Sequence, residues 1–453
     1  MSIIETTNTG ERAGGRGAAS ERLGGAANER ASERPGGTAT SPRPAVRGLL
    51  DRAFPPPRLA PFELEILARL QTALDEVVEP LAAEHDAAGR YPHRAIAALK
   101  PTGILHASFP RALGGPGASH RLTLEAQVRM AVADSSVAQI VRVHEDSVRE
   151  LHVGASEAFV ARLAEILLEE DAIIGLAVAE NGRRVDSPLN TIATPQADGA
   201  VVFDGGKIYA TGSGGADYVV VIGFDPVAGR DDPLAGLRSA LVAATTPGLR
   251  LHDDWNALGQ RATSSGSVTL DGLRVAPPLS ESPSTGVLPH SGARFQASFA
   301  AELVGIGIAA LRAAAPFVLE QSRPWPSADV DSAAQDPTVR RLTGELTADL
   351  VAAYAAVIAT GDLLDAYEAG EIDRTQLAVP IYAAKAAATR ASLRATSEIF
   401  TLMGTRSATG GKGFDRFWRN ARTLSLHDPY EWKHSEIGRH VLEGWDPEPG
   451  LYT

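Results

Sequence analysis

The spacing of apolar residues changes three times along this chain of 453 residues. Residues 5–45 hold one large apolar side chain, Leu23, and are otherwise dominated by Gly, Ala, Ser, Thr, Arg, Glu and Pro. A segment of this composition cannot bury enough surface to offset the entropy that it loses on ordering. We therefore expect residues 1–58 to form a disordered tail.

An amphipathic helical pattern begins at Pro61. Its apolar residues recur at steps of three and four, at Leu64, Leu67, Leu70, Leu74, Val77 and Leu81. Shorter segments with a helical pattern follow at residues 94–99, 123–133, 136–151 and 156–169, and a loop rich in Gly and Pro covers 103–117. These patterns predict an all-helical domain over residues 59–170.

From Ile173 the period becomes that of β-strands. Runs rich in β-forming residues occupy positions 173–178, 200–203, 218–222 and 267–275. Asp-Gly pairs, which are typical of tight hairpin turns, stand at 198–199, 204–205 and 271–272. Because no helical pattern separates these runs, we expect an antiparallel β-barrel or sandwich over residues 171–285.

Helical patterns return at Phe295 and continue towards the C-terminus. Long Ala-rich segments cover residues 339–364 and 379–403, and small residues of this kind let helices pack closely. They predict a four-helix bundle over residues 286–453, with broad contacts between subunits. The fold class of the whole chain is therefore expected to be α+β.

Composition and charge exclude several kinds of partner and site. The chain has no cysteine, which removes disulfides, thiolate nucleophiles and Cys-ligated metal centres. Its net charge of −12 disfavours binding to nucleic acid or to anionic membranes.

The most apolar run, 300–319, includes Glu302 and Arg312, which favours a buried helix over a membrane span. His427 and His434 would lie about 10 Å apart on a helix, so no shared metal site is expected. Without an apolar leader after the N-terminus, we expect a cytoplasmic location.

Residues 413–433 carry a dense group of aromatic, cationic and hydrogen-bonding side chains. Within them, Asp428 suits the N-cap of a helix, Pro429 suits its first position, and Glu431 stands three residues after the cap. This pattern predicts a helix that starts here with Asp428 as its N-cap. His427 would then stand just outside a helix N-terminus, where backbone N–H groups and the helix dipole favour an anion.

Several motifs, in their order and spacing, resemble the acyl-CoA dehydrogenase superfamily from about residue 60 to 453. Residues 203–212 (FDGGKIYATG) are similar to a hairpin that lies beside the flavin in that family, and residues 255–266 (WNALGQRATSSG) to a second motif of its β-domain. Three further motifs resemble the flavin monooxygenases built on this fold: SRPW at 322–325, GTRS at 404–407 and FDRFWRNARTLSLHDP at 414–429. That group contains dibenzothiophene monooxygenase and the sulfur-acquisition oxidoreductases.

The resemblance implies a two-component flavin-dependent monooxygenase with an acyl-CoA dehydrogenase-like fold. Reduced FMN, or alternatively FAD, would come from a separate flavin reductase. O2 would add to it as a C4a-hydroperoxide, which oxygenates a small organosulfur or similar substrate. His427 matches a histidine that helps to form or stabilise this hydroperoxide, because an imidazole can supply or hold a proton near pH 7. His144 matches a second histidine that faces the flavin pocket. The resemblance also implies a homotetramer or homodimer in sulfur metabolism.

The resemblance further implies a set of flavin-binding residues. Thr211 matches a hydroxyl group that hydrogen-bonds near flavin N5, and Ser213 lies among backbone donors close by. Trp255 matches a ring that stacks beside the isoalloxazine. Arg323 and Arg406 match cations that meet the flavin phosphate, from the same or a neighbouring subunit.

Two alternatives stay open. An acyl-CoA dehydrogenase-like FAD oxidoreductase needs a carboxylate base, and Asp428 occupies the matching position. A degenerate flavoprotein with a non-catalytic role is suggested by Leu176 and Val178, which replace polar residues expected near the flavin. Gln321 similarly stands where an arginine is often found.

Overall fold

The computed structural model describes residues 50–182, 188–283 and 288–450 of the chain. The predicted tail therefore lies outside the described residues up to position 49. Two of its last residues, Leu50 and Phe54, differ from the prediction because they pack on the folded chain. The Phe54 ring lies 5.3 Å from the ring of Tyr354, edge to face, and Leu50 is also partly buried against the C-terminal helices. These two apolar side chains supply the surface that the rest of the tail lacks.

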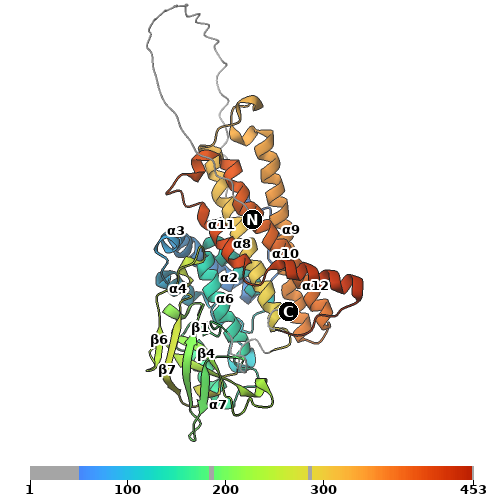
Figure 1. Ribbon diagram of the computed structural model, residues 1–453. Helices are drawn as coiled ribbons and strands as arrows, with labels where there is room; N and C mark the ends of the chain where they lie inside the picture. The colour runs from blue at the N-terminus through green and yellow to red at the C-terminus, as the bar shows by residue number, and fades with distance from the viewer. Residues whose placement is uncertain (1–49, 183–187, 284–287, 451–453) are drawn as a thin grey trace, which may run out of the picture. The chain divides into compact units, whose positions relative to one another are not determined.

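Helices alone form the N-terminal region (Figure 1). They are α2 (Pro61–Ala73), the π-helical turn η1 (Leu74–Val78), α3 (Glu79–Ala88), α4 (His93–Leu99), α5 (His120–Ala133), α6 (Ser135–Glu150) and α7 (Glu157–Leu168). The predicted apolar stripe is confirmed at Leu70 and Leu74, whereas Leu64 is 43% exposed. Because a π-turn takes more residues than an α-turn, Val78 rather than Val77 becomes fully buried.

Within the described residues, the middle of the chain forms one seven-stranded sheet. Its strands are β1 (Ile174–Ala177), β2 (Ile192–Pro195), β3 (Val201–Lys207), β4 (Tyr218–Phe224), β5 (Leu237–Ala243), β6 (Leu249–Leu251) and β7 (Val268–Val275). The order is β1-β4-β2-β3-β7-β6, and β5 pairs with β4. The sheet is mixed rather than wholly antiparallel, because β1 and β2 run parallel to β4 while the other pairs are antiparallel.

Two of the three Asp-Gly pairs do not form the predicted turns. The pair at 198–199 lies in the tight connection between β2 and β3, as predicted. The pairs at 204–205 and 271–272 instead lie inside β3 and β7, which are neighbours in the sheet. The register shifts at this point, and the Asp204 carboxylate accepts a hydrogen bond from the Gly272 N–H at 2.7 Å. The Asp204 side chain thus supports the irregular pairing between β3 and β7 at this point.

Long helices form the C-terminal region (Figure 1). They are α8 (Ser291–Glu320), α9 (Pro337–Glu368), α10 (Arg374–Met403), α11 (Asp415–Ser425) and α12 (Tyr430–Glu443). Helix α8 packs against α5, α9, α10 and α11 in one apolar cluster, so the shorter helix α5 of the N-terminal region joins the three long helices there. Helices α8 and α9 have the length and apolar composition of a membrane span, but 72% of the most apolar part of α8 is buried inside the fold.

Helix α6 carries the polar face from which the candidate site is built. It follows Asp134, whose carboxylate accepts a hydrogen bond from the Ser136 N–H at 2.9 Å and caps the helix. Most of its residues are buried, because α5 and α8 pack on it together with strand β1. Polar side chains on this helix must therefore find their partners within the fold.

Candidate active site

Polar residues on α6 and α8 form a buried chain of ion pairs. Arg142 Nη1 donates to Asp146 Oδ2 at 2.8 Å, one turn along α6. Arg294 of α8 donates from Nη1 to Asp146 Oδ1 at 2.7 Å, and from Nη2 to Glu150. Burial raises the pKa of Asp146 to about 6, although the two guanidinium groups oppose this shift. Charges buried this deeply are tolerated because each finds a partner.

Three groups meet around the ring of Phe299 on α8. Arg142 Cζ lies 4.1 Å from the ring centre, and Lys385 Nζ of α10 lies 4.6 Å from it. The His427 ring centre is 4.5 Å away. Cations at such distances are attracted to an aromatic ring. Phe299 therefore brings α6, α10 and the turn between α11 and α12 to one place.

Glu302 and Lys385 are fully buried, and burial favours the neutral form of each. Glu302 accepts a hydrogen bond from Gln127 Nε2 at 2.6 Å, and Arg142 Nε lies 3.9 Å from it. Burial raises the pKa of Glu302 to about 8, against the opposing charges of Arg142 and Lys385. Burial lowers the pKa of Lys385 to about 7. At pH 7, Glu302 is thus mostly protonated.

His427 lies in the turn after α11, where its backbone N–H donates to the Leu424 carbonyl at 3.1 Å. The residue keeps an exposed surface, but protein atoms enclose the rest of its ring. Burial, together with the charges of Arg142 and Lys385, lowers its pKa to about 4. The imidazole is therefore neutral at pH 7. It offers one N–H donor and one nitrogen acceptor, and it is not a protonated imidazolium acid.

Asp428 does not cap helix α12, so that prediction is wrong. The helix begins at Tyr430 with Pro429 as N-cap, and no side chain caps it. Asp428 has a left-handed backbone with φ of 69°. Its carboxylate instead accepts a hydrogen bond from Gln296 of α8 and lies 3.4 Å from Lys433 Nζ. Burial raises the pKa of Asp428 although Lys433 opposes it. Tertiary partners thus engage Oδ2 of the carboxylate that was expected to cap the helix.

His144 links three segments and lies outside the cluster around Phe299. It is fully buried, and its Nε2 donates to the Leu105 carbonyl at 2.6 Å. Its Nδ1 accepts from the Ile174 N–H at 3.0 Å, so the ring ties α6 to strand β1. Burial lowers its pKa to about 4. Because both ring nitrogens are engaged by backbone groups, neither is available for catalysis.

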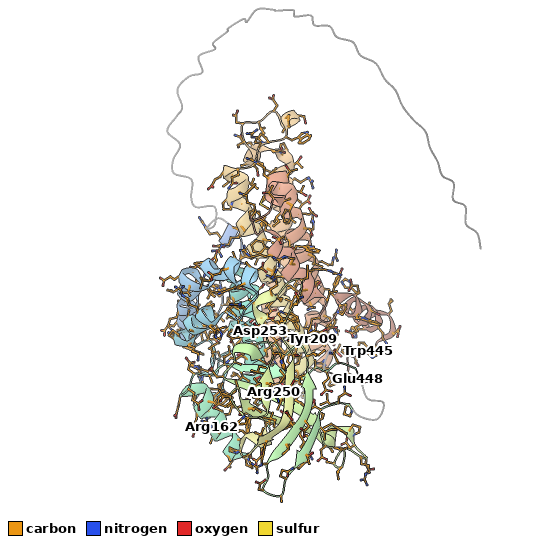
Figure 2. The ribbon with its side chains drawn as sticks, turned by 60° about the vertical axis from the view of Figure 1, so that its left-hand side comes forward. Arg162, Tyr209, Arg250, Asp253, Trp445 and Glu448 are labelled. Atoms are coloured by element: carbon orange, nitrogen blue, oxygen red, sulfur yellow. The ribbon has the colours of Figure 1, made fainter. Side chains whose placement is uncertain are left out.

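The flavin candidates of the sheet region gather in neighbouring loops. Thr211 Oγ1 lies 3.0 Å from Ser265 Oγ, and Trp255 Nε1 donates to the Gln260 carbonyl at 2.8 Å. The Tyr209 ring lies 6.0 Å from that of Trp255, edge to face, and is 64% exposed (Figure 2). Sequence reasoning missed Tyr209, although it stands two residues before Thr211 in the same motif.

Strand β1 approaches these loops through its backbone. The Leu176 N–H donates to the Thr211 carbonyl at 3.3 Å, while the side chains of Leu176 and Val178 pack in an apolar cluster. A Cβ at Gly175 would lie 2.9 Å from Ser213 N, so only glycine allows this approach. Ser213 Oγ is buried and has no hydrogen-bond partner among the described residues. An exposed aromatic ring beside backbone donors and an unpaired hydroxyl fits a flat ring with a polar edge, such as FMN.

The loop at residues 255–260 is anchored to α11, the helix that precedes the histidine of the site. The Gln260 N–H donates to Asn420 Oδ1 at 2.7 Å. A Cβ at Gly259 would lie 2.1 Å from the Arg419 carbonyl oxygen, so this contact requires glycine. One helix therefore sets the positions of both the Trp255 loop and the histidine turn.

Arg323 and Arg406 are exposed just beyond the C-terminal ends of α8 and α10. The two ends lie together because Ser322 Oγ donates to the Met403 carbonyl at 3.0 Å. Within the described part of the chain, no hydrogen bond or ion pair joins these arginines to the loops of the sheet. Their role as phosphate ligands therefore stays a prediction.

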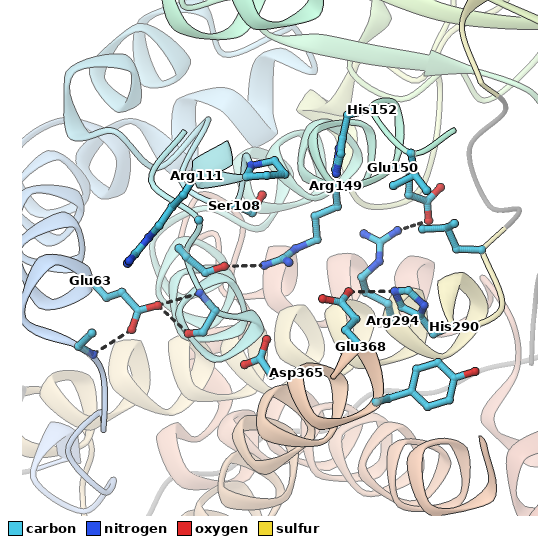
Figure 3. A pocket seen from close by; sticks show the side chains of 18 of the residues that line it. Glu63, Ser108, Arg111, Arg149, Glu150, His152, His290, Arg294, Asp365 and Glu368 are labelled. Carbon is cyan, nitrogen blue, oxygen red and sulfur yellow. Dashed lines mark hydrogen bonds and ion pairs between the residues drawn. The ribbon is translucent and has the colours of Figure 1, made fainter. Parts of the chain in front are cut away.

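A second polar region lies at the other end of the ion-pair chain, in a pocket of about 790 Å³ (Figure 3). Arg294 and Glu150 line it. One oxygen of Glu368 lies 2.8 Å from His120 Nε2 and 3.0 Å from His290 Nε2. Burial raises the pKa of Glu368, but the hydrogen bonds from both histidines lower it overall.

The same pocket contains a group with metal-ligand spacing. Ligand atoms of His120, Asp365 and Glu368 lie within 4.8 Å of one another. However, Arg149 Nη1 lies 3.3 Å from His120 Nε2, and a guanidinium there repels a metal cation. We therefore interpret the group as a hydrogen-bonded cluster. Among the described lining residues, none is a candidate named from the sequence.

Sequence reasoning missed the charged residues around Phe299. Arg142, Glu302 and Lys385 interrupt helical patterns that are otherwise apolar or Ala-rich. Charged residues are rarely fully buried unless they are paired or functional. A charged residue within an apolar helical pattern is therefore the signal that could have indicated these positions. For Glu302, that signal was used only as an argument against a membrane span.

Comparison with known proteins identifies the family. The acyl-CoA dehydrogenase N-terminal domain matches residues 62–166, and the acyl-CoA dehydrogenase C-terminal domain matches residues 297–432. Dibenzothiophene monooxygenase of Rhodococcus qingshengii is 34% identical over 388 residues, which cover 82% of this chain and 91% of that protein.

Two solved structures share the fold. FMN-bound TdsC from Paenibacillus sp. A11-2 matches with a TM-score of 0.78 at 30% identity, over 86% of this chain and 100% of that one. Methanesulfinate monooxygenase MsuC from Pseudomonas fluorescens matches with a TM-score of 0.76 at 28% identity, over 87% and 100%. The chain therefore belongs to the acyl-CoA dehydrogenase family and, within it, to the flavin-dependent monooxygenases.

Proposed function

We propose that this protein is the oxygenase of a two-component system, which accepts reduced FMN from a separate reductase and uses O2 to oxygenate a small organosulfur compound. The observation that carries the proposal is the position of His427. Its ring packs on Phe299, while the residue as a whole keeps an exposed surface. His427 also follows α11, the helix that anchors the Trp255 loop. The site thus combines a neutral imidazole, aromatic rings and hydroxyl groups on a shared scaffold.

Each of these groups has a role in the proposed reaction. Reduced FMN would supply electrons and, with O2, the oxygen atom that is transferred. Thr211 and Ser213 would hold its polar edge, with Tyr209 and Trp255 beside its ring. His427 would donate an N–H hydrogen bond at the reacting oxygen, since its neutral form prevails at pH 7. Protein around the rest of the imidazole limits water there, which favours transfer over release of hydrogen peroxide.

The contacts of the site favour this reading over both alternatives. As the base of a dehydrogenase, Asp428 would need a free carboxylate, but Gln296 and Lys433 both contact its Oδ2. A non-catalytic flavoprotein was suggested by Leu176 and Val178. Their side chains pack in the apolar cluster, so that the backbone rather than the side chain of β1 approaches the Thr211 loop.

Isotope incorporation tests the proposal. The purified protein is mixed with a flavin reductase, NADH, FMN, ¹⁸O₂ and, in turn, dibenzothiophene, dimethyl sulfoxide and methanesulfinate. We expect at least one substrate to gain an ¹⁸O atom, and only when the reductase is present. If every reaction yields hydrogen peroxide alone, the proposal fails. A protein that purifies with tightly bound FAD and reduces a dye with an acyl-CoA would instead be a dehydrogenase.

We also infer a homotetramer or homodimer located in the cytoplasm. Large apolar side chains are exposed on α12, where Trp432 is 67% and Leu442 is 85% exposed. Apolar surface of this kind suits contact with another copy of the chain. Light scattering of the purified protein should give two or four copies, and a monomer at micromolar concentration would contradict the inference. Cell fractionation tests the location.

A further inference from the structure

Lys385 of α10 carries an amino group that packing alone does not explain. The residue is fully buried, and among the described residues its Nζ makes no hydrogen bond. Nζ lies 4.6 Å from the centre of the Phe299 ring. A contact of this kind recovers only part of the free energy that an ammonium group loses when it leaves water. An apolar side chain would fill the same space at a lower cost, so the lysine needs a functional explanation.

The ring that Lys385 contacts is also the ring on which His427 packs. The ring centres of Phe299 and His427 lie 4.5 Å apart, so the amino group and the imidazole approach the same phenylalanine. Lys385 is fully buried, whereas His427 keeps an exposed surface. The amino group therefore lies on the inner side of the histidine turn.

Burial lowers the pKa of Lys385 to about 7, and charges from four elements modify this shift. Asp428, in the turn after α11, is the leading charge and favours the ammonium form, as does Glu302 of α8. Arg142 of α6 and Lys433 of α12 oppose it. A buried lysine in such surroundings can both release and regain a proton near neutral pH.

The proposed reaction consumes one proton that the site has to supply. When reduced FMN enters as its monoanion, its two electrons and one hydrogen combine with O2, the sulfur compound and one proton. The products are oxidised FMN, a new S–O bond and one water. His427 holds no surplus proton at pH 7, because its pKa is lowered to about 4. Backbone groups engage both ring nitrogens of His144. Another group must therefore hold this proton.

We propose that Lys385 supplies the proton and acts through His427. One N–H bond of the ammonium group breaks, and the acceptor nitrogen of the imidazole takes the proton. The N–H on the opposite side of the imidazole then passes its proton to the reacting oxygen, which leaves as water. The Lys385 amine regains a proton from solvent between turnovers. This inference rests on the proposed function and adds a residue to it, one that touches neither FMN nor the substrate.

The mutual effect of the two charges favours transfer in this direction. Burial, Arg142 and then Lys385 lower the pKa of His427. When Lys385 gives up its proton, its share of this repulsion disappears, and the imidazole becomes a better acceptor. Bound FMN and substrate would cover the exposed surface of His427, so during the reaction a proton reaches the imidazole from the side of Phe299.

Glu302 is the other buried group near Phe299 that carries a proton at pH 7, because burial raises its pKa to about 8. It faces away from the histidine turn in its contacts. Gln127 Nε2 donates to its Oε1 at 2.6 Å, and Arg142 Nε lies 3.9 Å from the same oxygen. Lys385 shares a ring with His427 and Glu302 does not, so we assign the proton to Lys385.

Titration of the flavin-free protein tests whether Lys385 exchanges a proton near neutral pH. The chain has five lysines, so a protein labelled with ¹³C at lysine Cε gives few resonances. We expect one of them to titrate with a midpoint near pH 7 and to be missing from the spectrum of Lys385→Met. If the resonance that disappears titrates only above about pH 9, as an ordinary lysine does, the inference is overturned.

Product formation tests whether the reaction uses this proton. Lys385→Met should lower the rate of product formation by about 100-fold, with the consumed O2 released as hydrogen peroxide. FMN binding, measured by fluorescence titration, should be unchanged. Lys100→Met is the matched control, because Lys100 is partly exposed and pairs with Asp217 at 3.4 Å. Glu302→Gln should also keep its product. Loss of product in Glu302→Gln but not in Lys385→Met would overturn the inference.

Chemical rescue separates a proton source from a side chain that only fills space. The chain has no cysteine, so Lys385→Cys can be alkylated at this position alone, in urea before refolding. Treatment with 2-bromoethylamine restores an amino group, whereas iodoacetamide adds a neutral amide of similar size. We expect product formation to return only with the amine, and equal activity of the two adducts would refute a proton source. If Lys385→Met matches the wild type, the inference falls while the proposed function stands. A wild type that releases only hydrogen peroxide refutes both.

Discussion

The carboxylate of Asp428 accepts a hydrogen bond from Gln296, on helix α8, and makes no cap for the helix that it precedes. Gln296 stands three residues before Phe299, so both side chains lie on the same side of α8. The link therefore holds the turn that carries His427 against the ring on which the imidazole packs. Asp428 positions the histidine, and its Oδ2 is already engaged by Gln296 and Lys433.

Asp428→Asn should keep most of the activity, because the amide oxygen can still accept from Gln296. Asp428→Ala removes the acceptor, leaves buried Gln296 and Lys433 with one partner fewer, and should lower the free energy of unfolding by about 1–3 kcal/mol. Steady-state turnover and urea unfolding measure the two effects. If Asp428→Asn abolishes turnover as fully as Asp428→Ala while its stability is normal, the carboxylate acts as a base and the dehydrogenase alternative returns.

His427→Phe should reduce oxygen transfer by about 100-fold or more, because it removes the N–H donor and the acceptor at the reacting position. FMN binding should survive, since the Thr211 and Trp255 loops are intact. Product formation and flavin fluorescence titration measure these two properties. His434→Phe, an exposed position on α12, should behave as the wild type. Normal product formation by His427→Phe would remove His427 from the mechanism.

Gly259→Ala should separate the Trp255 loop from α11. The added Cβ would lie 2.1 Å from the Arg419 carbonyl oxygen, and relieving this overlap should cost about 1–3 kcal/mol of unfolding free energy or more. The control is Gly344→Ala on α9, where a Cβ has no heavy atom within 4 Å. That helical position should gain about 0.5–1 kcal/mol. Equal stabilities of the two variants in urea would contradict the proposed anchor.

The free energy of unfolding should fall as the pH drops from about 6.5 to about 4. Burial lowers the pKa of His144 from 6.5 to about 4 in the folded protein, so in this window the unfolded chain binds more protons. This group alone accounts for up to about 3 kcal/mol. Urea unfolding at several pH values should give a flatter dependence for His144→Gln. His434→Gln, at an exposed position, should keep the wild-type slope, and an unchanged slope in His144→Gln would refute the assignment.

Much of the secondary structure was readable from local pattern. The three-part order of helices, sheet and helices is confirmed, because apolar periodicity reports which face of an element is buried. Local pattern failed where a distant partner decided the outcome. Asp428 matched the pattern of an N-cap, yet its carboxylate accepts a hydrogen bond from Gln296. The Asp-Gly pairs at 204–205 and 271–272 matched the pattern of turns, yet they lie inside strands β3 and β7, which pair with each other.

The candidate site shows the same division. The motif around His427 was visible in the sequence, and the structure adds that its ring meets Phe299. His144 shared the same chemistry, but backbone groups of Leu105 and Ile174 occupy its ring, and nothing in its own segment indicates this.

The sequence by itself determined the helices and strands, the family, and the presence of a histidine turn, because these depend on residues close together in the chain. Only the tertiary structure decided that Arg142 and Lys385 meet at the ring of Phe299, with Glu302 beside Arg142. Arg142, Glu302 and Lys385 stand on three different helices, and each is a charged residue in a helical pattern that is otherwise apolar or Ala-rich. Burial in one place shifts the pKa values of Glu302 and Lys385 and leaves Lys385 Nζ without a hydrogen-bond partner among the described residues.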